Sequence, residues 1–203
     1  MSHERLELFV LKCATISSAL RRETSKLGQS QYVDDPLIGG VGGDLVPYIN
    51  QFDLRNRINA MNMAEYYRLL YMLENDIREL IEDTLGAVHG ASWWQKCVPQ
   101  AVREEGSKNL KRESEAGISL RSNRDLDYIT FGQLGEIIRS NWGDFAGIFS
   151  NQPALSRVLS SLNMSRAAIA HCGILAEDEV DRLRLNVKDW FRVLAGPTAV
   201  GAA

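Results

Sequence analysis

The chain has 203 residues, of which 45% are hydrophobic and 24% are charged, and its formal net charge is −3. This length fits one domain, or one domain with an extension, and it is long enough to bury a substantial core. The charge excludes a surface that is basic throughout, so any contact with RNA must be a local patch.

The sequence also predicts a compartment. No apolar run approaches the length that a bilayer-spanning helix requires. The first residues, Met1–Arg5, lack the character of a signal peptide. Cys13, Cys97 and Cys172 are few, odd in number and far apart, which argues against a disulfide framework and for a reducing cytosol. We therefore expect a cytoplasmic protein without a membrane partner.

Residues 1–46 are expected to form an N-terminal extension. Apolar side chains recur at helical spacing over residues 4–27, which predicts one amphipathic helix whose stripe is apolar enough to pack on the rest of the protein. The residues that follow contain Gly39-Gly40-Val41-Gly42-Gly43. This cluster lacks the spacing of a dinucleotide fingerprint and the Gly-Lys-Ser/Thr ending of a phosphate loop, so a connector is favoured over a phosphate cradle.

Residues 64–85 form the strongest predicted helix, which Gly86 should end. Its apolar stripe recurs at helical spacing and consists of Tyr66, Leu70, Leu73, Ile77, Leu80 and Leu85. Its polar face holds Glu65, Arg68, Glu74, Asp76, Arg78 and Glu79. This pattern is typical of a helix that lies on a core with one face in water.

The segment between this helix and the motif is also predicted to be helical. Pro99 suits the first turn of a helix, and the charged segment 103–124 is typical of an exposed helix that ends near Ser122-Asn123. Thr130 can cap the next helix, which runs through Phe131, Leu134, Ile137 and Ile138. A further short apolar helix contains Trp142, Phe145 and Phe149.

Two longer helices complete the predicted fold, at residues 153–171 and 176–194. The buried candidates are Leu155, Val158, Leu159, Leu162 and Ile169 in the first, and Val180, Leu183, Val187, Trp190 and Leu194 in the second. No segment of alternating polarity competes for a strand. The fold class is therefore all-α, an antiparallel helical bundle over residues 47–195 with a tail at residues 196–203.

The helix predicted at residues 153–171 carries the most informative chemistry. It contains Arg166 and His171, five residues apart among small and apolar side chains. Arginine binds phosphate through its charge and its rigid fork of donors, and histidine transfers protons near neutral pH. These two groups are the minimum for cutting RNA, with no cofactor and no metal expected.

The motif Leu162-Asn163-x-x-Arg166-x-x-Ile169-Ala170-His171 resembles the motif helix of the HEPN domains, all-α modules whose signature is Arg, four to six residues, then His. Further blocks are similar to one HEPN branch, which is found in a yeast RNA-surveillance endonuclease and in many bacterial proteins. They are the run from Tyr67 to Ile81, Trp93-Trp94 followed by Val98-Pro99, and Asp127-Tyr128-Ile129-Thr130-Phe131-Gly132. The chain departs from many active members at Ala167, where they place Asn, Asp or His.

The resemblance implies a dimeric site. At about 100° per residue, Arg166 and His171 lie about 140° apart around one helix, so a single chain presents them poorly. In the family two motif helices meet, and the small side chains Ala167, Ala168 and Ala170 permit a close approach. His171 would act as general base on the ribose 2′-hydroxyl or as acid to the leaving 5′-oxygen, and Arg166 would neutralise charge on the phosphorane.

Glu74, Arg78 and Asn163 are candidates for supporting roles, and Asp76 is an alternative to Glu74 in one of them. Glu74 and Arg78 have the spacing of an intrahelical ion pair, although Glu74 or Asp76 can also orient His171 from across the bundle. Asn163, one turn before Arg166, can position the guanidinium or the phosphate, or it can be an ordinary polar residue at the interface.

The first functional hypothesis is a homodimeric, metal-independent endoribonuclease that cleaves single-stranded RNA, in toxin-like or antiviral defence or in RNA processing. An antitoxin or another partner protein would then accompany it. The alternative is a catalytically inactive HEPN module that dimerises, binds RNA or a nucleotide, or serves a partner protein. A third hypothesis is a helical adaptor unrelated to HEPN.

Other groupings favour structural roles. Cys172 adjoins His171, and adjacent helical side chains point apart, so a nucleophilic dyad is disfavoured. His89, Cys97, His171 and Cys172 match no standard zinc spacing. Trp93-Trp94 fits core or interface packing better than base stacking. A solvated face is also favoured over an RNA patch for Arg103, Lys108, Lys111, Arg112, Arg121 and Arg124.

Overall fold

The computed structural model describes residues 45–194, and every regular element in this range is helical, which confirms the all-α prediction there. The helix predicted at residues 4–27, the glycine-rich connector up to residue 44 and the tail at residues 196–203 lie outside the described residues. The chain divides into two compact units between Asn62 and Met63, within helix α3 (Leu54–His89). None of the described helices combines the length and the apolar character needed to cross a membrane.

The described part of the first unit contains α2 (Val46–Ile49) and the start of α3. Pro47 occupies the first turn of α2, where its missing N–H leaves no bond unmade. The Asp53 carboxylate accepts a hydrogen bond from the Arg55 N–H at 2.9 Å, as an N-cap residue does. None of the predicted site residues belongs to this unit.

α3 carries the predicted apolar stripe into the core of the second unit. Its buried apolar residues are Leu70, Leu73, Ile77, Ile81 and Leu85. The helix is longer than predicted, since it begins at Leu54 and continues past Gly86 to His89. The prediction that Gly86 ends it is wrong because Gly90 is the residue with the left-handed φ of +66°, which glycine adopts without steric cost.

Four elements connect α3 to the rest of the core: the 3₁₀ turn η1 (Gly90–Ser92), α4 (Trp93–Cys97), α5 (Gln100–Glu115) and the 3₁₀ turn η2 (Asp125–Tyr128). Pro99 directly precedes α5. The charged helix predicted up to Ser122 ends earlier, at Glu115, and Gly117 follows with a φ of +68°. α5 packs closely on η2, so that a Cβ on Gly106 would stand 3.1 Å from the Ile129 side chain.

The remaining helices are α6 (Phe131–Ser140), α7 (Trp142–Phe145), α8 (Gln152–Ala170) and α9 (Glu177–Leu194). Thr130 caps α6 as predicted, and its N–H donates to the Gln133 side chain at 2.8 Å within a capping box. Phe149 is buried but lies beyond the end of α7. All the residues predicted to be buried in α8 are buried, whereas Val187 and Leu194 in α9 are only partly buried.

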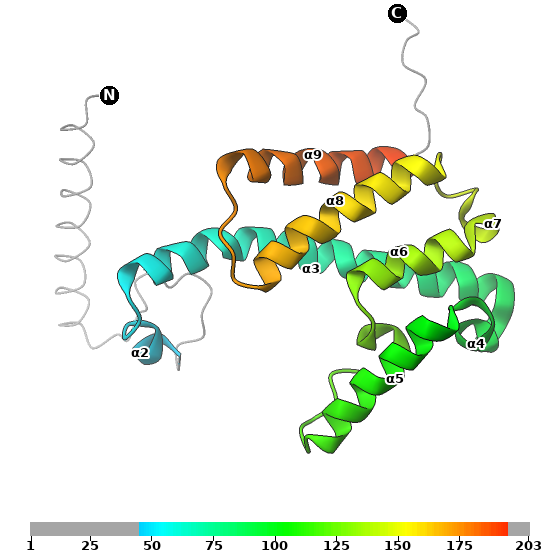
Figure 1. Ribbon diagram of the computed structural model, residues 1–203, viewed down its shortest axis with the longest axis horizontal. Helices are drawn as coiled ribbons and strands as arrows, with labels where there is room; N and C mark the ends of the chain where they lie inside the picture. Colours follow the sequence, from blue (N-terminus) through cyan, green and yellow to red (C-terminus); the bar gives the residue numbers. More distant parts are fainter. Residues whose placement is uncertain (1–44, 195–203) are drawn as a thin grey trace, which may run out of the picture. The chain divides into compact units, whose positions relative to one another are not determined.

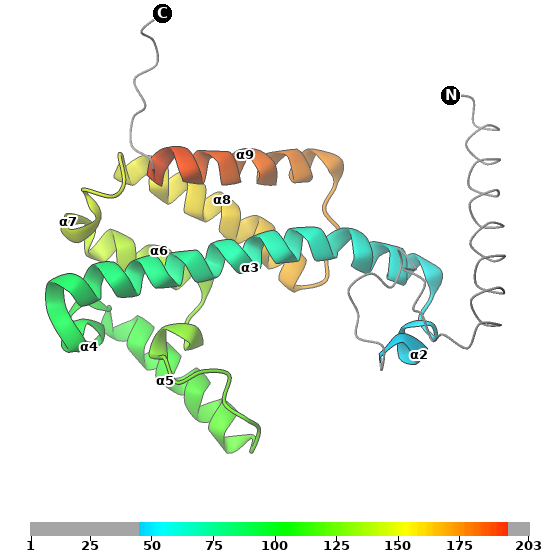
Figure 2. The ribbon, with the colours of Figure 1, turned by 180° about the vertical axis from the view of Figure 1, so that it is seen from behind.

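The second unit places α8 between two neighbours. α8 and α9 run antiparallel, and the Ser150 N–H donates to the Val193 carbonyl at 3.1 Å where α8 begins and α9 ends (Figure 1). α6 packs on α8, and α3 lies across them so that one apolar core forms from their facing side chains (Figure 2). The motif helix is therefore supported from both sides and by α3.

α8 ends in a Schellman cap, which fixes the backbone around the motif histidine. His171 is the C-cap residue, the Cys172 N–H donates to the Ile169 carbonyl at 3.0 Å, and the Gly173 N–H donates to the Ala168 carbonyl at 2.8 Å. Cys172 adopts a φ of 59°, the left-handed conformation that this motif requires. The prediction that His171 belongs to the helix is therefore wrong, because this cap stops the helix at Ala170.

Candidate active site

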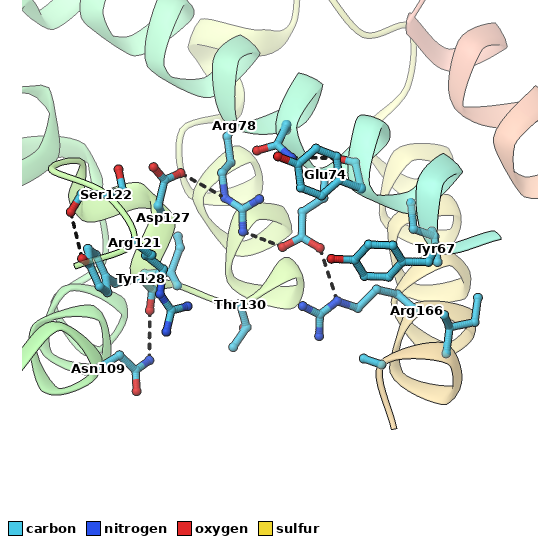
Figure 3. Close-up of a pocket in the computed structure, with 16 residues that line it drawn as sticks. Tyr67, Glu74, Arg78, Asn109, Arg121, Ser122, Asp127, Tyr128, Thr130 and Arg166 are labelled. Atoms are coloured by element: carbon cyan, nitrogen blue, oxygen red, sulfur yellow. Dashed lines mark hydrogen bonds and ion pairs between the residues drawn. The ribbon is translucent and has the colours of Figure 1, made fainter. Parts of the chain in front are cut away.

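Arg166 lines an open pocket of about 580 Å³ in the second unit (Figure 3). The pocket is formed by α3, by Asn109 of α5, by residues 121–130 and by the end of α8. Its charged groups are Arg78, Arg121, Arg166, Glu74 and Asp127. A volume of this size suits a small ligand or one unit of a polymer.

Glu74 connects the two arginines nearest the centre of the pocket. Its Oε1 accepts a hydrogen bond from Arg78 Nη2 at 2.5 Å, and its Oε2 accepts one from Arg166 Nε at 3.3 Å. The Glu74 side chain is 12% exposed, whereas that of Arg166 is 38% exposed. A buried carboxylate requires compensating positive charge, which one residue of the same helix and one residue of α8 supply here.

The ion pairs continue from Glu74 along the wall of the pocket. Arg78 Nε lies 3.6 Å from Asp127 Oδ1, and Asp127 accepts two hydrogen bonds from Arg124 at 3.0 and 2.9 Å. The Arg124 hydrogen bonds hold the pKa of Asp127 below its ordinary value, although burial acts in the opposite direction. The same contact raises the pKa of Arg124. Charges alternate in sign along this series, so each has an opposite neighbour.

His171 lies outside the pocket that Arg166 lines. It is exposed and directly follows Ala170, which is part of the pocket. Within residues 45–194 its ring makes no hydrogen bond, so the idea that Glu74 orients it is wrong: both Glu74 oxygens bind arginines. Asp76 is exposed on α3 and forms no hydrogen bond to the ring either. The imidazole is therefore accessible to solvent, to RNA or to another subunit.

Asn163 is also outside the pocket. It is half-buried on α8 and faces α6, since a Cβ on Gly132 would stand 3.6 Å from its Nδ2 atom. In the described range it forms no hydrogen bond to Arg166. The structure thus brings Arg166 together with Glu74 and Arg78, and it separates these three from His171 and Asn163.

Arg121 and Tyr128 form the wall of the pocket far from Arg166 (Figure 3), and the sequence did not predict that either residue belongs to the site. The Arg121 guanidinium lies 5.3 Å from the centroid of the Tyr128 ring, and its Nε pairs with Glu113 at 2.9 Å. The Tyr128 hydroxyl donates to the Ser122 carbonyl at 2.8 Å, which fixes the ring. The block at residues 127–132, which carried part of the family resemblance, was the signal that pointed to this wall.

Three basic residues of this region, Arg121, Arg124 and Lys111, lie in different surroundings. Arg121 lines the pocket and Arg124 belongs to the ion pairs around Asp127, where Arg124 Nη1 also binds Glu82 at 3.0 Å. Lys111 is exposed and pairs with Glu115 on the same helix at 3.6 Å. The expectation of a solvated face thus describes Lys111 and also Arg121, whose exposed side chain lines the pocket as well.

The other groupings considered from sequence do not form a metal or base-stacking site in the described residues. Among the described residues no three His, Cys, Asp or Glu side chains gather as a metal site requires. His89 pairs with Asp144 at 2.9 Å, and burial raises the pKa of the Cys97 thiol. Trp93 and Trp94 pack edge to face against the core, with ring centroids 5.6 Å apart.

These features define an all-α module that carries an Arg-x4-His motif at the end of a core helix. Residues 68–195 match the family model described as Swt1-like HEPN, and the chain belongs to this family. The match confirms the resemblance that the sequence suggested, including the branch. No curated protein and no solved structure matches the chain. HEPN domains often dimerise and bind RNA, and the family is associated with ribonuclease or nucleotide-binding function.

Proposed function

We propose that the protein is a homodimeric endoribonuclease that cleaves single-stranded RNA, with Arg166 and His171 as catalytic residues. The placement of Arg166 carries the proposal. Glu74 holds its Nε, while its terminal nitrogens make no hydrogen bond with residues 45–194 and lie at an open pocket. A guanidinium fixed in this way is preorganised to bind a phosphate group.

Each group has a defined step in this reaction. His171 removes the proton from the 2′-hydroxyl, the 2′-oxygen bonds to phosphorus, and the bond from phosphorus to the 5′-oxygen breaks. A second imidazole donates the proton that the leaving 5′-oxygen takes up, which leaves a 2′,3′-cyclic phosphate and a 5′-hydroxyl. Arg166 stabilises the negative charge on the phosphorane. No metal ion takes part in this scheme.

The second imidazole would come from a second copy of the chain. One subunit has a single motif histidine, His171, which is exposed at the end of α8 and does not line the pocket of its own chain. Two α8 ends placed together supply both the base and the acid, and Ala167 and Ala170 keep that contact close. Asn163 is proposed to support the arrangement near this contact.

A second candidate function is RNA or nucleotide binding without cleavage, in the service of a partner protein. Ala167 favours it, because many active HEPN ribonucleases have a polar side chain directly after the arginine. In that case Arg166 would bind phosphate and His171 would have no proton to transfer.

The test is incubation of the full chain with single-stranded RNA, or with DNA of the same sequence, in excess chelator. The proposal predicts RNA fragments with cyclic phosphate ends and intact DNA. Arg166→Ala and His171→Ala should each lower the rate by about 10²–10⁴-fold without change in the dimer measured by light scattering. Binding without cleavage by the unmodified protein supports the second candidate, and cleavage that survives both substitutions contradicts the assignment of residues.

The proposed setting of this activity rests on the family resemblance and on the few, widely separated cysteines. A nuclease that acts on single-stranded RNA would work in the cytoplasm, in RNA processing or in toxin-like or antiviral defence. In a defence role an antitoxin or another partner protein would restrain it.

A further inference from the structure

Two exposed tyrosines line the pocket beside Arg166. Tyr67 and Tyr71 lie one turn apart on α3, with ring centroids 6.3 Å apart and an angle of 37° between the ring planes. They are 59% and 60% exposed although both line the pocket. Large aromatic faces are thus open to solvent next to a buried group of ion pairs, and neither the core nor the catalytic scheme uses them.

We propose that Tyr67 and Tyr71 stack an unpaired nucleobase of the RNA whose phosphate Arg166 binds. This inference rests on the proposed action on RNA, and it adds the part of the substrate that the pocket binds beside the scissile phosphate. A base–aromatic stack requires a base that is free of its neighbours, so the ligand class is single-stranded RNA rather than a duplex.

The pocket places the tyrosine rings beside one cation and across from another, as the bases and phosphates of a single strand would require. In the view of Figure 3 the Tyr67 ring projects toward the Glu74–Arg166 pair, which puts a base on that ring close to the guanidinium. Arg121 lies on the other side of the pocket with its side chain 59% exposed, and it offers a second cation to the next phosphate along the strand. A single strand held this way has alternating contacts to base and phosphate.

The charges favour RNA over a protein segment at this surface. Glu74 and Asp127 are already shared among arginines, whereas the terminal guanidinium nitrogens of Arg166 are charged donors at the pocket that make no hydrogen bond with residues 45–194. An apolar peptide that covered the tyrosines would bury these nitrogens without acceptors, which is costly. A nucleotide supplies the acceptors and the flat ring together.

The experiment measures binding without cleavage. The His171→Ala protein is titrated into a fluorescent single-stranded RNA and, separately, into a strand of equal length without bases, with fluorescence anisotropy as the readout. Adding Tyr67→Ala should weaken binding of the RNA by about 5- to 100-fold and leave binding of the baseless strand unchanged. Tyr67→Phe should retain affinity for the RNA, and Arg166→Gln should weaken binding of both strands.

Phe191→Ala is the matched control, because Phe191 is 56% exposed on α9 and does not line the pocket. Equal RNA affinity for Tyr67→Ala and Phe191→Ala would overturn the stacking role, and so would an equal loss for both strands. Loss of the dimer in Tyr67→Ala without an RNA-specific loss would identify the tyrosines as a protein contact instead. Absence of cleavage by the unmodified protein would refute the proposed nuclease, yet this binding result would remain readable.

Discussion

The two motif residues, Arg166 and His171, are held in place by different interactions. The side chain of Arg166 is held by Glu74 of α3, so a long-range ion pair sets the position of its guanidinium. At His171 only the backbone is fixed, through the hydrogen bonds of the Schellman cap, and within the described chain its ring has no hydrogen-bond partner. One subunit therefore positions the guanidinium of Arg166, whereas the imidazole of His171 is exposed where α8 ends.

The ion pairs around Arg166 and the cap at His171 should therefore contribute differently to stability. The ion pairs at Arg166 involve buried charges, and removal of one partner leaves another charge buried and uncompensated. The cap at His171 is local and contains a non-glycine residue in a left-handed conformation, so it includes some strain. Substitutions at the arginine end should thus be severe, and those at the histidine end should be smaller and of either sign.

The largest effect is expected for Glu74→Ala, which should lower the free energy of unfolding by about 3 kcal/mol. Arg78 then loses the nearer of its two carboxylate partners and keeps only Asp127 at 3.6 Å, and Arg166 loses the contact at its Nε. Urea denaturation at neutral pH measures the change. Glu79→Ala on the exposed face of α3 is the control and should stay within about 0.5 kcal/mol. Equal effects of the two substitutions would show that the Glu74 pairs add nothing to the fold.

A somewhat smaller loss, of about 2 kcal/mol, is expected for Gly173→Ala at the histidine end. A Cβ at this position would stand 2.8 Å from the Ala168 carbonyl oxygen, which is backbone and cannot move without opening the cap. Gly143→Ala on α7 meets no atom within 4 Å and serves as the control for urea denaturation. Because the cap sets the backbone at His171, RNA cleavage should fall in Gly173→Ala as well; an unchanged unfolding curve would show that the turn relaxes.

The features of this region that could be predicted from sequence are those between residues close together in the chain. Periodicity identified the buried face of α8 and the Glu74–Arg78 pair, because both depend on spacing along one helix. Periodicity also placed Glu74 on a polar face, yet Glu74 is buried. Its partner Arg166 lies 92 residues away in the sequence, and the two meet only because α8 packs near α3, which the spacing along one helix cannot predict. The far wall with Arg121 and Tyr128 was missed because the path of a loop leaves no periodic signal.

The end of α8 shows a similar limit at shorter range. Gly173 is the first glycine after this helix, and glycine adopts a left-handed conformation without steric cost. In the structure Cys172 has that conformation and Gly173 follows it, where its lack of a Cβ permits close approach to Ala168. Helical periodicity carries no information on which of these two neighbouring residues takes the left-handed conformation.

The stability of the protein should depend on pH through Asp127, which belongs to the ion pairs that extend from Glu74. The pKa of Asp127 is lowered, chiefly by its hydrogen bonds from Arg124, so its contribution is fully present above the ordinary carboxyl pKa of about 3.9. That contribution is lost as the pH falls through the lower pKa of the folded state. Asp127→Asn should therefore lower the free energy of unfolding by about 1.5 kcal/mol at pH 7, with a difference from the unmodified protein that shrinks toward pH 2. The exposed neighbour Asp125, changed to Asn, is the control, and a difference that stays constant with pH would contradict the role of the carboxylate.

The smallest effect is expected for Cys172→Gly, and it should be stabilising. Relief of the left-handed conformation contributes about 1 kcal/mol, and the greater freedom of glycine in the unfolded chain offsets about half of it, so the net gain is about 0.5 kcal/mol. Cys172→Ala keeps the Cβ and the strain, and it should leave the midpoint of urea denaturation unchanged, which separates the backbone effect from loss of the thiol. If both variants gain equally, the thiol rather than the backbone is the cause. Because neither substitution alters the hydrogen bonds that position His171, both should retain cleavage of RNA, whereas a loss in Cys172→Gly alone would show that the strained backbone is what holds the histidine in place for catalysis.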